Sequence, residues 1–174
     1  MAKVRKFVAY RRLERPYTRK SRYREKSFIR GNPQTRIIRH NMGNPQGSFD
    51  YVLKLRVNDT LQIRDRALEA CRLILNRHLE KKIGKELFYL RLKVYPHHHL
   101  RENPLASGAG ADRLSTGMKN SFGKVIDIAA QVHAGKDLFE LHIGKEKLLQ
   151  AKTILALAKS KVPCGIHITV EPRA

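Results

Sequence analysis

Positive charge is concentrated at the start of the chain. Residues 1–40 contain 14 Lys or Arg but only two acids, Glu14 and Glu25, a net charge of +12. The other residues carry 22 basic and 13 acidic side chains, and the formal net charge of the whole chain is +21. Like charges at this density repel one another in a compact state. The first segment therefore cannot build a core of its own, and it is expected to order against a polyanion.

Aromatic residues interrupt this basic segment at intervals. Five of the twelve Phe and Tyr residues lie there, and they are Phe7, Tyr10, Tyr17, Tyr23 and Phe28. Arg pairs with phosphates, and aromatic rings stack on bases, so the pattern favours RNA as the polyanion. We assign residues 1–33 to a basic RNA-binding N-terminal extension, poorly ordered without RNA. Its predicted RNA contacts are Arg11, Arg12, Tyr17, Arg19, Lys20, Arg22, Tyr23 and Arg24.

The other polyanion to consider is an anionic membrane. No run approaches the roughly 18 apolar residues of a membrane span, and MAKVRKFVAY lacks the apolar stretch of a signal peptide. The basic segment also lacks the apolar stripe that interfacial binding requires. The sequence thus favours an intracellular protein with no membrane partner. Cys71 and Cys164 form no CxxC motif, and we expect two buried thiols rather than a disulfide.

A pattern typical of a folded domain begins at about residue 34. Residues 49–57 alternate between apolar and polar side chains, which predicts a strand. Further strands are expected at 35–40, 87–95, 125–133, 138–143 and 166–170, and helices after Asp59 and over 145–161. Asp59 is the expected N-cap of the first helix, with Gln62 in a capping box. Its expected buried stripe is Ile63, Ala67, Ala70, Cys71, Ile74 and His78. This order predicts an α+β class: one domain over 34–174 with a mixed sheet and two helices.

A glycine-rich stretch separates two of these strands and is predicted to be a long loop at about 97–123. Loops of this length in compact domains are usually functional or disordered, and small residues allow close backbone approach. Within and beside the loop we predict RNA contacts by His97, His98, Lys119 and Lys124, and by Arg64 on the first helix. A flexible solvated loop remains the alternative.

No motif for catalysis or cofactor binding emerges from the rest of the chain. His97–His99 have no Cys, Asp or Glu at zinc-ligand spacing. The glycines of 107–113 lack the third glycine of a dinucleotide fingerprint, and those of 117–124 miss the P-loop spacing. No serine has a neighbouring general base in a recognisable motif. We therefore expect no metal, no cofactor, no small-molecule substrate and no enzymatic activity.

Several motifs resemble one known family. They are Val94–His98, Leu100–Asn103, Gly108–Arg113, Gly117-Met118, Phe122–Lys124, Gln62–Asp65 with Ala67–Ala70, and Arg11–Leu13 with Pro16–Arg19. Together they resemble the large-subunit ribosomal protein family L-sixteen/L-ten-e, in its archaeal and eukaryotic branch, over essentially the whole chain. The end at Ala174 is similar to archaeal members. Pro104-Leu105 departs from the pattern, where members more often have Lys-Met, and this puts the local loop conformation in doubt.

The resemblance implies a specific fold and function. Members have an α/β-hammerhead-like α+β fold and bind large-subunit rRNA beside the aminoacyl-tRNA site of the cytoplasmic ribosome. The loop that matches 101–116 reaches toward the peptidyl-transferase centre and the tRNA acceptor ends, and members join the subunit late in assembly. The implied partners are large-subunit rRNA, tRNA in the aminoacyl and peptidyl sites, and other large-subunit ribosomal proteins. The implied loop residues are Arg101, Glu102, Asn103, Ser107, Gly108, Ala109, Gly110, Ala111, Asp112 and Arg113.

Two alternative functions remain open on the residues alone. A non-ribosomal RNA-binding module, such as an assembly factor, has the same charge pattern but associates substoichiometrically with the subunit. An RNA-modifying or RNA-cleaving enzyme that uses His97–His99 or Glu102 would show turnover on RNA and lose it on substitution of the histidines.

Overall fold

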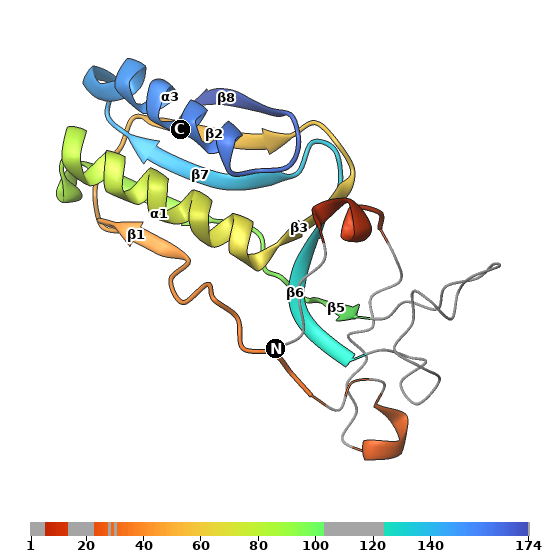
Figure 1. Ribbon diagram of the computed structural model, residues 1–174. Coiled ribbons are helices and arrows are strands. Elements are labelled where there is room, and N and C mark those ends of the chain that lie inside the picture. The colour runs from red at the N-terminus through yellow and green to blue at the C-terminus, as the bar shows by residue number, and fades with distance from the viewer. Residues whose placement is uncertain (1–5, 14–22, 28, 30, 103–123, 174) are drawn as a thin grey trace.

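The described residues of the chain fold into an α+β structure with two sheets and two α-helices. The computed structural model describes residues 6–13, 23–27, 29, 31–102 and 124–173 (Figure 1). The α+β class expected from the sequence is confirmed. The strands divide between two sheets rather than one mixed sheet, and every strand pairing among the described residues is antiparallel.

The larger sheet has five strands in the order β1-β4-β7-β2-β8. Their bounds are β1 Asn41–Gly43, β2 Tyr51–Val57, β4 Phe88–Leu92, β7 Asp137–Ile143 and β8 Ile166–Pro172. Burial alternates along the central strands as their sequences predict. Leu53 and Leu55 of β2 and Leu141 of β7 are fully buried on one face of the sheet, so this face forms the core.

Two helices contribute to that core. Helix α1 spans Asp65–Lys82, and α3 spans Leu148–Ala156, preceded by the 3-10 turn η5 (Lys145–Lys147) and continued by η6 (Leu157–Ser160). Leu68, Cys71, Leu75 and Leu79 give α1 a fully buried stripe. Burial raises the pKa of the Cys71 thiol to about 12. The two cysteines are free, Cys71 buried and Cys164 half-buried.

The opposite face of the five-stranded sheet carries ion pairs. The Arg56 guanidinium contacts Asp137 at 2.7 Å and Glu171 at 3.5 Å, and Lys54 also pairs with Glu171. Lys93, directly after β4, pairs with Glu140 of the neighbouring strand β7 at 3.0 Å. Because acids neutralise these cations, this face offers a polyanion less net attraction than the N-terminal segment, in which basic residues far outnumber acids.

The smaller sheet has the order β3-β6-β5, with bounds β3 Leu61–Arg64, β6 Lys124–Val132 and β5 His98–Glu102. It extends away from the five-stranded sheet (Figure 1). Four chain connections join the sheets: β2 to β3, β3 through α1 to β4, β4 to β5, and β6 to β7. In the β6–β7 connection, Gly135 N–H donates to Val57 O at the end of β2 at 2.7 Å, which ties this connection to the one from β2 to β3. Gly135 has φ +81°, a left-handed value that suits glycine.

Three local expectations are wrong. Asp59 does not cap a helix: its carboxylate accepts from Gly165 N–H, and Leu61–Arg64 form β3 before α1 begins at Asp65. The most buried side of α1 is accordingly not the stripe expected from a helix that includes Ile63. The loop also begins later than residue 97, because His98–Glu102 pair with β6. In each case, tertiary pairing overrides a local signal.

Candidate nucleic-acid interface

The described part of the N-terminal segment docks on β3. Residues Phe7–Tyr10 form the 3-10 turn η1, and Tyr10 is 9% exposed in a small cluster with Leu100 and Ala129. Gln62 N–H donates to Arg11 O at 3.3 Å, so the segment adds to the free edge of β3. The Gln62 side-chain amide donates to Tyr10 O at 3.2 Å and also to Arg12 O. Residues 6–13 of the predicted extension thus lie against the three-stranded sheet, and the poor order of the extension without RNA stays a prediction.

Arg64 lies on the same sheet and covers the Tyr10 ring. Its guanidinium carbon is 4.7 Å from the ring centroid, a cation–π contact. Burial lowers the pKa of Arg64 from its ordinary value, although it remains charged at neutral pH. Arg11 and Arg12 are exposed on the docked segment. This arrangement presents cations along the outer edge of the three-stranded sheet.

A row of three aromatic rings lies where β4 leads toward β5. Tyr95 is 44% exposed, and its ring stacks on His40 with centroids 5.6 Å apart and an interplanar angle of 25°. The centroid of the His97 ring lies 4.6 Å from that of Tyr95, with an interplanar angle of 47°. Exposed Arg39 adjoins His40 in the chain. We call His40, Tyr95 and His97 the ring ledge; it offers flat surfaces of the kind on which RNA bases stack.

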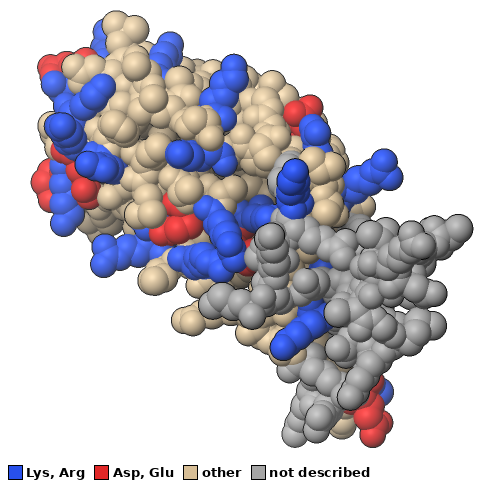
Figure 2. All heavy atoms as spheres, in the orientation of Figure 1, with Lys and Arg blue, Asp and Glu red and all other residues tan. Residues whose placement is uncertain are grey.

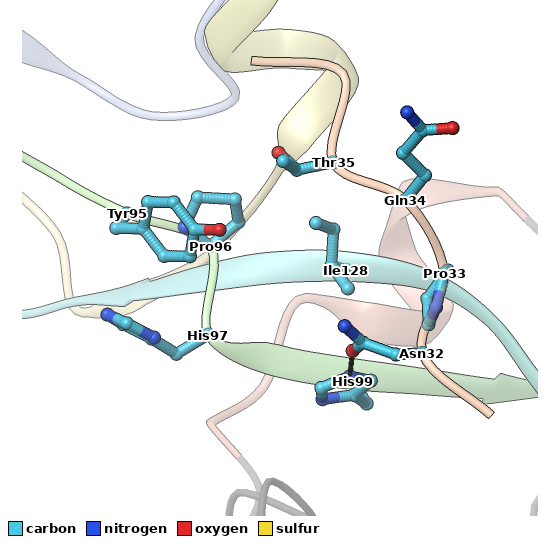
Figure 3. A pocket seen from close by; sticks show the side chains of 9 residues that line it. All are labelled: Asn32, Pro33, Gln34, Thr35, Tyr95, Pro96, His97, His99 and Ile128. Carbon is cyan, nitrogen blue, oxygen red and sulfur yellow. Dashed lines mark hydrogen bonds between the residues drawn. The ribbon is translucent and has the colours of Figure 1, made fainter. Parts of the chain in front are cut away.

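The ring ledge borders a hollow of about 390 Å³. Figure 3 shows Tyr95, Pro96 and His97 on one side and the segment Asn32–Thr35 on the other, with the Ile128 side chain between them. The hollow is therefore apolar at its floor and polar at its rim. The volume falls within the range of small-ligand sites, and six of the nine lining residues carry polar side-chain groups.

The three consecutive histidines have different surroundings. His97 is exposed, whereas His98 is 3% and His99 6% exposed. Burial, with His99 and Arg101 nearby, lowers the pKa of His98 to about 4. His99 Nε2 lies 2.7 Å from Asn32 Oδ1. His97 and His99 both line the hollow, as strand alternation predicts. No group of three or more His, Cys, Asp or Glu that could hold a metal occurs among the described residues.

Two buried carboxylates fix the junction between the sheets. Asp65 at the start of α1 and Asp127 of β6 both accept from Arg36 Nη1, at 3.1 Å and 3.0 Å. Arg66 Nε lies 3.3 Å from the second oxygen of Asp127. Burial and the neighbouring Asp127 raise the pKa of Asp65. The network holds residues 31–36 against the sheet, and with them one wall of the hollow.

The charge on the visible surface is predominantly basic. Figure 2 shows Lys and Arg spread over one face of the molecule, with fewer Asp and Glu. No helix in the described parts of the chain is long and apolar enough to cross a membrane.

Comparison with known proteins agrees with these features. The family described as Ribosomal protein L16p/L10e matches residues 14–169. "Large ribosomal subunit protein uL16" of Hyperthermus butylicus is 42% identical over 90% of this chain and 84% of its own. The proteins of the same name from Thermofilum pendens and Archaeoglobus fulgidus are 43% and 40% identical, over 90% and 93% of this chain and 89% and 90% of theirs.

The chain belongs to the ribosomal protein L16p/L10e family. The resemblance seen in the sequence, including its archaeal type, is confirmed. This is a family of ribosomal structural proteins and not of enzymes.

Within this L16p/L10e chain, the predicted RNA contacts fall in different places. Arg11, Arg12, Tyr23, His97 and Lys124 are exposed. Arg24 lies in the 3-10 turn η2 (Arg24–Lys26), and Lys26 Nζ is 5.3 Å from the Tyr23 ring centroid. Tyr17, Arg19, Lys20, Arg22 and Lys119 lie outside the described residues. Arg64 is on β3 rather than on the first helix, and His98 is interior, so we do not retain the His98 ring as an RNA contact.

The loop residues implied by the family are described only at its first end. Arg101 is half-buried in β5, and Glu102 ends that strand opposite Lys124 of β6. The pairing shifts register between Leu100 and Arg101, as at a β-bulge. Asn103, Ser107, Gly108, Ala109, Gly110, Ala111, Asp112 and Arg113 lie outside the described residues.

Several residues of the interface were missed in the sequence. The ring ledge joins His40 to Tyr95 across more than fifty positions, and Asn32 reaches the hollow from another segment. Only spatial proximity relates them. The available signal was Tyr95-Pro96-His97, whose aromatic character lies at the end of a strand.

Proposed function

We propose that this chain is a structural constituent of the large ribosomal subunit. It binds large-subunit rRNA near the aminoacyl-tRNA site, and its loop extends toward the peptidyl-transferase centre and tRNA acceptor ends. In this role it supports tRNA positioning and late subunit assembly in the cytoplasm, with rRNA, tRNA and neighbouring ribosomal proteins as partners. The observation that carries the proposal is the family match over residues 14–169.

The geometry supports a division of tasks. The docked N-terminal segment, the hollow and both ends of the loop all belong to the three-stranded sheet. Glu102 and Lys124 are register partners, so the strand pairing itself brings the two ends of segment 103–123 together. Loop length therefore has little effect on the stability of the domain, because a twofold change in length alters the free energy of loop closure by only about 0.6 kcal/mol.

Deletion of residues 103–112 tests this proposal. We expect the variant to fold with a thermal midpoint close to the wild type and to bind large-subunit rRNA. Subunits that contain it should assemble late or form peptide bonds slowly. A double variant, Arg101→Ala with Arg113→Ala, keeps the loop length and removes two charges. Lys152→Ala with Lys159→Ala removes the same charge from exposed positions around α3 and serves as the control.

The outcomes separate the alternatives. If subunits with the deletion assemble and translate normally, the loop has no role in tRNA handling. If the variant shows no cooperative thermal transition, the loop is required for the fold. Sedimentation gives the second criterion: a subunit constituent remains stoichiometric through a high-salt wash, whereas an assembly factor is substoichiometric and is removed.

A further inference from the structure

The hollow beside the ring ledge has the composition of a base-binding pocket. We propose that it receives one unstacked nucleobase of large-subunit rRNA, stacked on Tyr95 and held at its edge by Asn32. The inference rests on the proposed function and names a specific contact within it.

The first step is the shape and lining of the hollow. Its volume of about 390 Å³ falls within the range of small-ligand pockets. Pro33, Pro96 and Ile128 supply apolar surface, and the Tyr95 ring is 44% exposed at the rim. A flat aromatic base removes such surface from water, and base–aromatic stacking tolerates any base because each has a π-face.

The second step is the polar edge. Asn32 Oδ1 lies 2.7 Å from His99 Nε2, and since a carbonyl oxygen can only accept, His99 donates to it. That bond fixes the amide, and its nitrogen points away from His99 toward the hollow (Figure 3). The amide nitrogen is a donor, so it suits a base edge that carries an acceptor, such as a carbonyl oxygen or a purine ring nitrogen.

The third step is the rigidity of the two walls. His40 stacks with Tyr95 at an interplanar angle of 25°, and the His97 ring is tilted against it at 47°, so the Tyr95 ring is held before RNA arrives. The opposite wall is anchored by Arg36, whose backbone N–H and guanidinium both donate to Asp65. A preformed site avoids the ordering cost that a mobile segment would incur on binding.

The fourth step identifies rRNA as the source of the base. Residues 31–35 continue directly from the basic N-terminal extension, which is expected to follow rRNA. Exposed Arg39 adjoins the ring ledge and can contact the phosphate of the same nucleotide. Sequence-specific RNA recognition generally targets bases that are splayed out of helices and stacked on aromatic side chains.

The test compares full-length wild type with Tyr95→Leu, Tyr95→Phe and Asn32→Ala by filter binding to protein-free large-subunit rRNA over a salt series. Tyr95→Leu should weaken binding by about 5- to 100-fold, while Tyr95→Phe should remain within about twofold. The slope of log affinity against log salt should not change, because stacking releases no counterions. Chemical footprinting should show one nucleotide protected by wild type and Tyr95→Phe and exposed with Tyr95→Leu and Asn32→Ala.

Each other result has a defined meaning. If wild type binds the rRNA and Tyr95→Leu binds equally well, the base pocket is wrong and the proposed function stands. If wild type does not bind the rRNA, the proposed function is wrong, and the base pocket that rests on it is wrong as well. A salt slope that falls by about one with Tyr95→Leu indicates a lost phosphate contact and overturns base stacking. Protection that appears on bulk tRNA instead of rRNA overturns the assignment of the base to rRNA.

Discussion

The N-terminal segment is held on β3 mainly by one ring and one glutamine, so a single substitution should release it. Tyr10 is 9% exposed, packs with Leu100 and Ala129, and lies beneath the Arg64 guanidinium. Tyr10→Ala removes the ring but leaves the Gln62 hydrogen bonds to the backbone possible. We therefore expect local detachment of residues 6–13 and a folded domain.

The expected size follows from the contacts. Burial of an aromatic side chain relative to its exposed form is worth about 1.5–3 kcal/mol, and the cation–π contact adds about 0.5–1 kcal/mol. The local opening free energy should thus fall by about 2–4 kcal/mol. Tyr10 belongs to a cluster separate from the main core, so the global thermal midpoint should fall by less than about 4 °C.

The Gln62 amide reports this opening directly. Its N–H donates to Arg11 O, whereas the neighbouring Ile63 N–H faces β6 by strand alternation. Hydrogen exchange at Gln62 should accelerate by about 30- to 700-fold in Tyr10→Ala, since each 1.4 kcal/mol is tenfold. Exchange at Ile63 should remain close to the wild-type rate.

Tyr10→Phe is the control, because it retains the ring and its contacts with Leu100. It should exchange at Gln62 within about fivefold of wild type. Unchanged exchange at Gln62 in Tyr10→Ala would falsify the anchoring role of the ring. Equal acceleration at Gln62 and Ile63 would mean that the segment is part of the cooperative core instead.

Three further substitutions test the fold. Gly43 has φ +85°, and a Cβ there would lie 2.2 Å from Phe88 O. Backbone strain and steric overlap in Gly43→Ala should together cost about 3 kcal/mol, which lowers the thermal midpoint by about 10 °C. Gly135 has a similar φ, but a Cβ there would meet no atom within 4 Å, so the thermal midpoint of Gly135→Ala should fall by less than half as much. Equal falls in the two variants would refute the role of the overlap with Phe88 O. The His98 pKa of about 4 lies below the unfolded value of 6.5, so the unfolded chain binds the extra proton between these values. The free energy of unfolding should therefore decrease as pH falls from 6.5 to 4. The thermal midpoint of His98→Gln should fall less between pH 7.5 and 5 than that of wild type. An identical fall in both proteins would show that other titrating groups dominate.

The sequence predicts four of the five strands of the larger sheet well because each of these four has a strong local pattern. The strand expected at 35–40 is wrong: β1 has only three residues, Asn41–Gly43, and is fixed by its pairing with β4. Alternation over residues 49–57 matches β2, and the segment 145–161 matches η5, α3 and η6 together. These segments bury one face against a single core, so periodicity alone is sufficient to place them.

The smaller sheet is less predictable because its strands are short and their pairing is non-local. Gln62-Ile63 fits a capping box in sequence, yet β3 is fixed by β6 on one side and Arg11 on the other. His98–Glu102 lack clear alternation, since His98, His99 and Leu100 are all buried. The interface shares this limitation: the family resemblance identifies the RNA partner, while the hollow depends on segments that only the fold brings together.

The separation of the two sheets explains how a chain of net charge +21 can keep a stable core beside a polyanion. On the open face of the large sheet, Glu140 and Glu171 neutralise Lys93 and Lys54, so the core does not depend on RNA for charge compensation. The buried acids at the junction, Asp65 and Asp127, compensate only the arginines that fix the walls of the hollow. Cations of the N-terminal segment have few acidic neighbours in sequence, and residues 10–12 of this segment contact β3 of the three-stranded sheet. The ion pairs of the described residues therefore balance charge around the core and the junction. The excess positive charge of the sequence lies in the N-terminal segment, where RNA would neutralise it.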